Sequence, residues 1–398
     1  MPRFAISQER LRSENIRDLM DEEGALCILD PEAPHSEVER SQGRAALVVH
    51  LYYMDLLEHY LPYLVAVPED VDLYLTTNDE ARAAKIRIAA GNILARHARG
   101  EVRVCAPRGR ELSALFLGCR DLFDQYDILG FLHDKKSVRK TDADGTVGAA
   151  FSKLLWESMV ASTSYVRQVL HIFRTEPQVG ILVPFPPTHG PYLAVSENFW
   201  TSCYDAACDF LARIGVRVPL ADDVTPVSLG SVFWARTEIF RKFLTYPLRL
   251  EDFSEEPMPI DGTFSHMLER IFPYLAQDAG LLTCYLATVD EARCDDLRFR
   301  RLYYTLKRQH NREAIDLDVY HRAADERLAI LRQQEKDLRR QEQMLQERDA
   351  GIHARDVLIR DREAVLQSIY ASRSWKLTAP LRKMGLLWRR FWESMDNR

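Results

Sequence analysis

The chain has 398 residues, of which 46% are apolar and 28% are charged, as is ordinary for a globular protein. These values exclude a collagen-like, a mostly disordered and a disulfide-stapled chain. Lys and Arg number 53 against 59 Asp and Glu, so the net charge is −6, and a weakly acidic chain is a poor general binder of nucleic acid.

The sequence carries no recognisable signal for export or for membrane insertion. Its start lacks the apolar core of a secretory signal, and no run approaches the roughly 18 apolar residues that cross a bilayer. Seven cysteines without a C-x-x-C pair indicate reduced thiols rather than a disulfide framework or a zinc site. We therefore expect a cytoplasmic protein.

Composition divides the chain into four regions, of which the first two are 1–43 and 44–316. Residues 1–43 are polar around one apolar island, and we expect an N-terminal helical extension there. Residues 44–316 alternate apolar runs with helical periodicity, which predicts an α/β domain with a mostly parallel sheet covered by helices. The expected strands are 45–51, 71–77, 102–105, 126–132, 179–184 and 227–235, and the expected helices are 81–97, 111–122, 151–174 and 262–275.

A seven-residue repeat dominates the third region, 317–371. The repeated apolar positions are Leu331, Leu338, Leu345, Ile352, Ile359 and Leu366. Such a seam predicts a coiled-coil helix and a homo-oligomer. The second seam is weak, because Leu328 is followed by Glu335 and Glu342, so a solvated helix leaning on the α/β domain is the alternative.

The fourth region, 372–398, ends in a basic amphipathic segment. Its apolar residues Leu386, Leu387, Trp388, Phe391 and Trp392 mix with Arg382, Lys383, Arg389 and Arg390, and no acid lies between Pro380 and Trp392. Basic and aromatic residues together suit the surface of an anionic membrane. A tail packed on its own domain is the alternative.

Polar motifs follow the expected strands, at the edge of the sheet where α/β proteins bind ligands. The strand 126–132 leads into the run His-Asp-Lys-Lys. Its Lys135 and Lys136 can neutralise a diphosphate, and Asp134 can hold a divalent cation. A loop of ordinary surface charges is the alternative. Signatures of dehydrogenases, P-loop proteins, zincins and serine hydrolases are absent from the sequence.

Two shorter motifs add binding groups. Arg108 and Arg110 flank a glycine before a helix, and such a turn can cradle an anion. Gly230 and Ser231 permit close approach of a ligand to the backbone, and Trp234 can stack on a sugar or a base. In the alternative interpretation, residues 230–236 are a buried strand with a core aromatic.

The last motif begins with Asp261, one residue before a glycine and a helix. Helical spacing puts His266 and Glu269 on one face and Arg270 beside His266. A carboxylate at such a helix start can act as a general base. In the alternative interpretation Asp261 only caps the helix.

The order and spacing of these motifs resemble the rhamnan synthesis protein F family over about residues 44–305. The matching segments are 49–53, 75–77, 108–111, 126–137, 230–236 and 261–270. The resemblance implies a GT-A-like glycosyltransferase of bacterial rhamnose-rich polysaccharide or O-antigen assembly. Separately, residues 372–382 look like a tail that is found on many bacterial glycosyltransferases.

On this resemblance a nucleotide sugar, with dTDP-rhamnose as one candidate, binds over the strand ends. The acceptor is a lipid-linked glycan at the inner face of the plasma membrane. The expected catalytic residues are Asp261, His266 and Glu269. Donor binding is expected at Thr77, Asp79, Arg108, Arg110, His133, Asp134, Lys135 and Lys136, and the acceptor or sugar pocket at Gly230, Ser231, Trp234, Arg236 and Arg270.

Two departures from the family bear on the metal. Residues 107–111 read Pro-Arg-Gly-Arg-Glu where the family usually shows Asn-x-Gly-Arg-Asp, and residues 133–135 stand where GT-A enzymes hold Asp-x-Asp. Asp134 is the single candidate metal ligand, so Mn²⁺ or Mg²⁺ is an optional cofactor. Lysine side chains can replace a metal ion in neutralising the diphosphate. The alternative function is a catalytically inactive GT-A-like scaffold module of a polysaccharide assembly complex.

Overall fold

The computed structural model describes residues 6–22, 25–33, 43–136, 146–185, 200–223, 228, 230–259, 261–313, 355 and 362–396, and the statements below concern these residues. The chain forms two compact units, residues 1–300 and 301–398.

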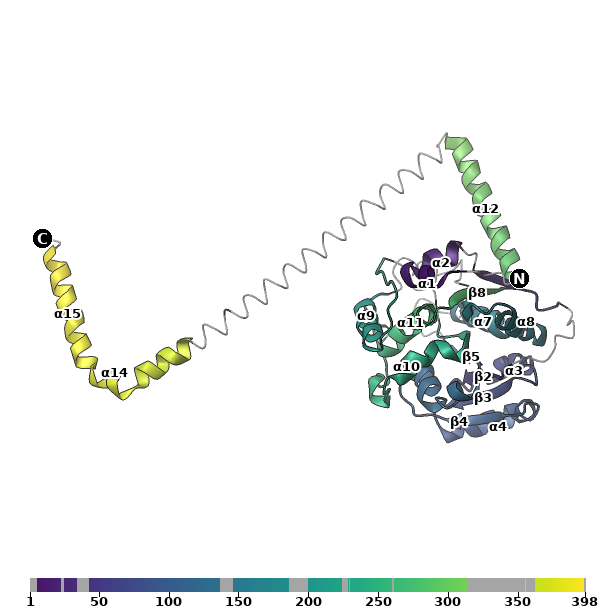
Figure 1. Cartoon of the computed structure of the whole chain (residues 1–398), viewed down its shortest axis with the longest axis horizontal. Helices are drawn as coiled ribbons and strands as arrows, with labels where there is room; N and C mark the ends of the chain where they lie inside the picture. Colours follow the sequence, from purple (N-terminus) through teal and green to yellow (C-terminus); the bar gives the residue numbers. More distant parts are fainter. Residues whose placement is uncertain are drawn as a thin grey trace. The chain divides into compact units, whose positions relative to one another are not determined.

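An eight-stranded sheet lies at the centre of the first unit (Figure 1). Its spatial order is β1-β8-β6-β7-β5-β2-β3-β4. Strand β7 is antiparallel to its neighbours β5 and β6, and the other neighbouring pairs are parallel. The α/β class and the mostly parallel sheet are thus confirmed. The strands are β1 (Leu26–Leu29), β2 (Ala45–His50), β3 (Asp72–Thr77), β4 (Gly100–Val104), β5 (Ile128–His133), β6 (Val179–Pro184), β7 (Phe233–Arg236) and β8 (Leu282–Thr288).

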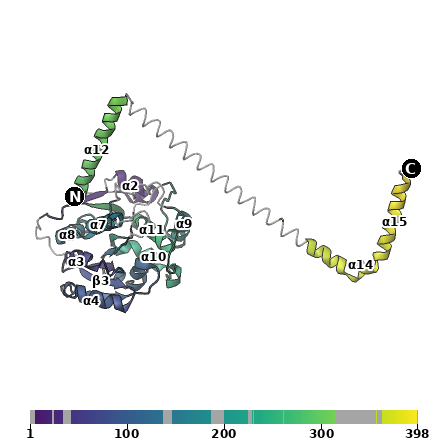
Figure 2. The same ribbon diagram turned by 180° about the vertical axis from the view of Figure 1, so that it is seen from behind.

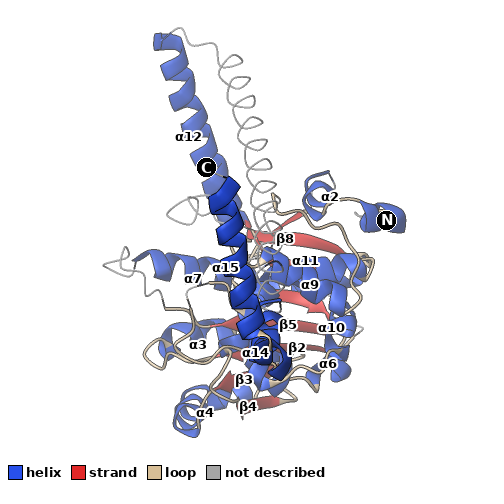
Figure 3. Cartoon of the chain, turned by 90° about the vertical axis from the view of Figure 1, so that its left-hand side faces the viewer, coloured by secondary structure: helices blue, strands red, loops and turns tan. Residues whose placement is uncertain are grey.

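Helices cover both faces of the sheet (Figure 3). One face carries α3 (Leu57–Val65), α4 (Glu80–Leu94) and α7 (Thr146–Val160), with α8 (Thr163–Thr175) packed beside α7. The other carries α9 (Tyr204–Arg213), α10 (Arg241–Thr245) and α11 (Phe264–Asp278). Figure 2 shows α3 and α4 beside β3 from behind. Because both faces are covered, β2, β5 and β6 are buried at every position, and this is why their sequences are continuous apolar runs.

Three predicted elements differ from the structure. Instead of one helix over 111–122 there are α5 (Arg110–Ser113), a π-helical turn and α6 (Leu122–Gln125). The helix expected over 151–174 is divided between α7 and α8, because Ser162 leaves the helical conformation and its Oγ accepts a hydrogen bond from the Tyr165 amide. The strand expected from residue 227 begins only at β7.

The N-terminal segment is part of the first unit. It contains the expected helices, α1 (Gln8–Ser13) and α2 (Ile16–Glu22), but its apolar island forms β1, which pairs with β8. Gln277 of α11 also donates hydrogen bonds to the carbonyls of Leu11 and Glu14. Residues on both sides of the boundary expected at residue 43 therefore belong to one compact unit, because β1 pairs with the edge of β8. The sequence pattern did not predict β8.

The second unit is described only in part. The chain continues from β8 into α12 (Val289–Glu313), and the later helices are 362–371, α14 (Arg373–Leu377) and α15 (Ala379–Asp396). Most of the heptad seam of 317–371 lies outside the described residues, so the coiled coil and the homo-oligomer stay predictions. Among the described helices, none combines the length and the apolar character needed to cross a membrane.

Candidate active site

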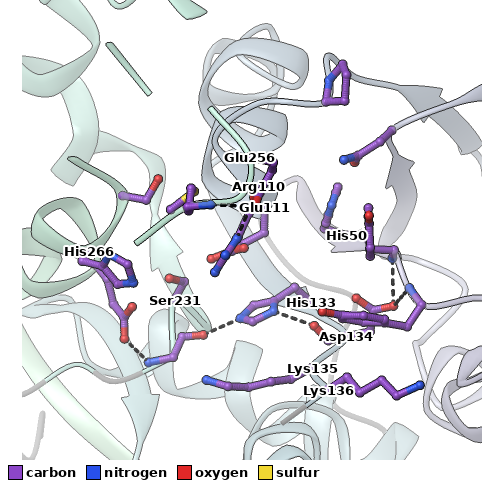
Figure 4. A pocket seen from close by; sticks show the side chains of 18 of the residues that line it. His50, Arg110, Glu111, His133, Asp134, Lys135, Lys136, Ser231, Glu256 and His266 are labelled. Carbon is purple, nitrogen blue, oxygen red and sulfur yellow. Dashed lines mark hydrogen bonds and ion pairs between the residues drawn. The ribbon is translucent and has the colours of Figure 1, made fainter. Parts of the chain in front are cut away.

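A cavity of about 960 Å³ lies at the carboxyl ends of β2, β3 and β5. The start of α11, the loop before it, α5 and the turn before β7 complete its lining. In Figure 4, His266 and Ser231 lie on one side of this space and His50 and Asp134 on the other. The volume is in the range of small-molecule sites, and the position is the one where α/β sheets bind ligands.

Most of the predicted site residues line this one cavity. The sheet brings them together from distant stretches of sequence, as the polar strand ends predict. They are Asp79, Arg110, His133, Asp134, Lys135, Lys136, Gly230, Ser231, Asp261, His266, Glu269 and Arg270.

Two residues expected in the sugar pocket lie away from it. Trp234 is buried inside the sheet, where its Nε1 donates a hydrogen bond to the Met159 carbonyl. Arg236 lies opposite Ile128, the first residue of β5, and donates to the carbonyl of Val179. Because β7 is antiparallel, only its beginning lies at the ligand edge, so the Gly-Ser turn reaches the cavity whereas Arg236 is at the far edge of the sheet.

Two residues expected at the donor do not line the cavity either. Thr77 is fully buried at the end of β3. Arg108 holds the loop before α11, since it donates to the carbonyls of Glu251 and Phe253 and pairs with Glu255. Its contacts are those of a structural residue.

Backbone strain concentrates at this cavity. Among the described residues, the non-glycine residues with a positive φ are Arg110 (52°), Thr201 (49°) and Ser231 (54°), and all three line it. Each such residue costs of order 1–3 kcal/mol and persists only where the surroundings enforce it. Two of them follow glycines that also have a positive φ, Gly109 and Gly230. Strain of this kind, gathered around one cavity, is typical of a functional site.

Asp134 is held at the base of the cavity. Its Oδ2 accepts hydrogen bonds from the backbone amides of Tyr52 and Tyr53, at 2.8 and 2.6 Å. The side chain is buried, and burial raises the pKa of Asp134 to about 6, although these amides and the nearby His133 oppose the rise. The carboxylate therefore fixes the loop after β2 rather than pointing freely to a ligand.

His133 connects β5 to the strained turn before β7. Its Nδ1 lies 2.8 Å from its neighbour Asp134's carbonyl oxygen, and its Nε2 lies 2.7 Å from the carbonyl oxygen of Gly230. A neutral ring can donate to one of these oxygens and the doubly protonated ring to both. On the other side of the turn, the Gly230 amide donates to Glu269 of α11. The turn that presents Ser231 is thus held from two elements.

Cations gather beside these residues. The Lys135 ammonium lies 4.7 Å from the centre of the Phe151 ring, and the structure records no carboxylate partner for it among the described residues. Arg110 pairs with Glu256 at 2.8 Å, and both side chains are nearly half exposed. Lys136 pairs with Asp55 at 2.7 Å and is also exposed. A bound anion can therefore recruit these cations at little cost.

Two further polar side chains complete this wall. Burial raises the pKa of the Glu111 carboxyl, but His133, the backbone, His50 and Lys135 outweigh it, so that its pKa lies below the ordinary value. Burial lowers the pKa of His50 to about 4, and its Nδ1 lies 2.9 Å from the Thr76 hydroxyl. His50 is therefore neutral at neutral pH.

The opposite wall is built around Asp261. Both of its oxygens accept from Arg270, at 3.0 and 3.1 Å, and it also accepts from the Gly262 amide and the Thr201 hydroxyl. Burial raises the pKa of Asp261, but these hydrogen bonds and Arg270 outweigh it, so the pKa lies below its usual value. At neutral pH this side chain is an ionised, immobilised carboxylate.

His266 and Asp79 both serve helix starts. The Nδ1 of His266 lies 2.7 Å from the Thr263 hydroxyl in a capping box at the start of α11, and 4.0 Å from Asp261. Asp79 caps α4 through the Arg82 amide and forms an ion pair with the Arg82 side chain. Asp79 is thus engaged in capping, whereas His266 also faces the cavity (Figure 4).

The acidic side chains do not fit a divalent metal. Among the described residues, no group of three His, Cys, Asp or Glu side chains could hold one. Asp134, the predicted ligand, is bound to two amides, and its neighbours are a histidine bound to carbonyls and a lysine. The neighbouring cations are groups that can pair with an anion instead.

Several cavity residues were not among the predicted ones. His50, Tyr52, Tyr53 and Glu111 belong to the segments on which the family resemblance was noted, so a signal for them existed. Asn78 also lines the cavity, and its Oδ1 is buried without a hydrogen-bond partner among the described residues. Glu256, Met258 and Thr201 come from loops whose sequences give no local signal.

The fold and the site define an α/β protein with a polar cavity at the strand ends, lined by both acidic and basic side chains. Over residues 18–281 the chain matches the family described as rhamnan synthesis protein F, and it belongs to that family. The expected family is thereby confirmed.

Relatives and solved structures add two comparisons. The chain is similar to the uncharacterized protein WxcX from two strains of Xanthomonas campestris pv. campestris. The two sequences are 29% identical over 249 aligned residues, and the aligned part covers 62% of this chain and 33% of WxcX. The chain thus spans about a third of the length of these relatives. A mannosyltransferase from Pyrobaculum calidifontis, PcManGT, solved with GDP-Man and Mn²⁺, is similar at a TM-score of 0.33 and 11% identity over 65% of this chain and 58% of that one.

Proposed function

We propose that this protein is a GT-A-like glycosyltransferase that transfers a sugar from a nucleotide sugar to a growing cell-surface polysaccharide. One observation carries the proposal: a single cavity at the strand ends has accessible cations on one wall and the ionised Asp261 on the other. Membership of the rhamnan synthesis protein F family supports a rhamnose-rich product. A rhamnosyl donor such as dTDP-rhamnose, a lipid-linked glycan acceptor and a cytoplasmic location are the finer parts of the proposal.

In this proposal the acceptor hydroxyl attacks the anomeric carbon of the donor sugar. The bond from that carbon to the diphosphate oxygen breaks, and the nucleoside diphosphate leaves with the electron pair. Lys135 and Arg110 neutralise the charge that grows on this leaving group, in the role that a metal ion fills elsewhere. Asp261 takes the hydroxyl proton, and its ion pair with Arg270 keeps it unprotonated beforehand.

A catalytically inactive binding module is the second candidate function. The hydrogen bonding of Asp261 favours it, because Arg270, Thr201 and Gly262 occupy the carboxylate and reduce its basicity. Such a module would bind the nucleotide sugar within an assembly complex without consuming it.

Thermal stabilisation by a panel of nucleotides and nucleotide sugars, followed by a turnover assay, separates these functions. A ligand at 100 times its dissociation constant adds about 2.7 kcal/mol, which is a readable shift. Stabilisation by one nucleotide class with turnover supports the enzyme, and stabilisation without turnover supports the binding module. No shift with any nucleotide sugar contradicts both.

A further inference from the structure

Helix α15 has an apolar face that is open to solvent. Leu381, Met384, Leu387 and Trp388 are between 64% and 69% exposed. At about 100° per residue, they lie within an arc of about 120° on the helix. The sequence continues the same period with Phe391, Trp392 and Met395. A helix with four exposed large apolar residues on one side needs a partner for that side.

The other side of α15 is basic. Arg382 and Lys383 fall outside the apolar arc. The sequence adds Arg389 and Arg390, and its acidic residues Glu393 and Asp396 come only in the last turn of the helix. Arg382 is stacked over Trp375 at 3.5 Å and donates to the Trp375 carbonyl, which ties α14 to α15. Lys383 is exposed and is free of such a contact.

We propose that α15 is a docking surface for an anionic lipid bilayer, in which it lies parallel to the surface. Large apolar and aromatic side chains enter the boundary between headgroups and acyl chains, and basic side chains remain among the headgroups. Charge decides between occupants: an anionic membrane complements the basic residues of this helix, whereas a second copy of it brings no opposite charge to Arg382 and Lys383. The helix is too polar to cross the bilayer. This inference does not depend on the proposed enzymatic activity.

The test is flotation of the full-length protein with vesicles of phosphatidylcholine, with and without phosphatidylglycerol. We expect binding that requires phosphatidylglycerol and weakens with salt. Leu387→Ala should lower the partition coefficient about tenfold, because buried apolar surface is lost. Leu386→Ala is the matched control, since Leu386 is 63% exposed on the basic side of the same helix, and we expect at most about a twofold change.

A charge variant tests the electrostatic part. Lys383→Glu changes the charge of the helix by two units. Each unit should lower the partition coefficient about fivefold, so the variant should bind about 25-fold more weakly. Lys85→Glu makes the same change on α4 and should leave binding unaltered. Equal losses for Leu386→Ala and Leu387→Ala would overturn the proposal. Failure to bind phosphatidylglycerol vesicles would also overturn it. If Leu387→Ala then dissociated an oligomer, the apolar face of α15 would be a contact between copies of the chain instead.

Discussion

The two walls of the cavity hold their charges in different ways. On the α11 wall, Asp261 accepts hydrogen bonds from Arg270, Gly262 and Thr201. Its side chain is 30% exposed, and that of Arg270 is 13% exposed. The other wall, called the strand wall here, is formed by α5 and the end of β5. On it Arg110 is 47% exposed in its ion pair with Glu256, and Lys135 rests on the Phe151 ring. A proton acceptor must be in position before the reaction, whereas long cationic side chains can close on an anion after it binds. In the proposed enzyme, this difference fits chemistry at the α11 wall and donor binding at the other.

The largest expected effect comes from Asp261→Asn. Asparagine keeps the shape and an acceptor for Arg270 but cannot take a proton. We expect the turnover rate to fall by about 10²–10⁴-fold, the usual contribution of a general base, with little change in nucleotide affinity. Single-turnover kinetics and calorimetric titration measure the two quantities.

Asp278→Asn is the matched control, because Asp278 lies at the other end of α11 and pairs with Lys242. It should leave turnover and affinity unchanged. If Asp261→Asn retains full turnover, Asp261 is not the base that takes the proton of the acceptor hydroxyl.

Asp134→Asn should change the pH dependence of stability. The pKa of this buried carboxyl is raised to about 6 from an unfolded value of 3.8, so between these values the folded state keeps a proton that the unfolded chain has lost. Ionisation of Asp134 therefore lowers the free energy of unfolding as the pH rises through this window. At about 1.4 kcal/mol for each unit of pKa difference, the loss is about 3 kcal/mol. Urea unfolding should show the variant close to the wild type at pH 4 and more stable at pH 7.

The comparison of the two pH values cancels the titrating groups that do not interact with Asp134. His133 and Glu111 do interact with it, so the measured difference includes their response. Asparagine retains an oxygen for the Tyr52 and Tyr53 amides. The same free-energy difference at both pH values would show that burial does not perturb Asp134.

Lys135→Ala should weaken nucleotide binding without unfolding the protein. A hydrogen bond to a charged group contributes about 1.5–3 kcal/mol, so the dissociation constant should rise about 10- to 150-fold. Lys136→Ala should raise it at most about fivefold, because Lys136 is exposed and already paired with Asp55. Calorimetric titration of both variants gives the ratio, and equal effects of the two lysines would remove the distinction between them.

Much of this fold could be predicted because both faces of the sheet are covered. That covering makes β2, β5 and β6 continuous apolar runs. Strand β1 was not predicted, because four residues inside a polar segment acquire their structure only by pairing with β8. No local pattern records a partner that lies 259 residues away in sequence.

The site divides in the same way. Residues directly after strands, such as Lys135, could be placed at the cavity because parallel strands bring their ends to one edge. Arg236 could not, because the direction of β7 is decided by its pairing with β5 and β6 and not by its own sequence. The strain at Thr201 and Ser231 likewise arises only when the surrounding elements are assembled.

The smallest expected effect is that of a chelator. If cations of the strand wall neutralise the diphosphate, EDTA should leave the nucleotide dissociation constant within about twofold, since Asp134 is bound to two amides and Lys135 beside it would repel a divalent metal ion. Calorimetric titration before and after EDTA, with Mn²⁺ added back, measures this. Binding that disappears with EDTA and returns with Mn²⁺ would mean that the carboxylates rearrange around a metal, and the strand wall would then be a metal site rather than a cationic one.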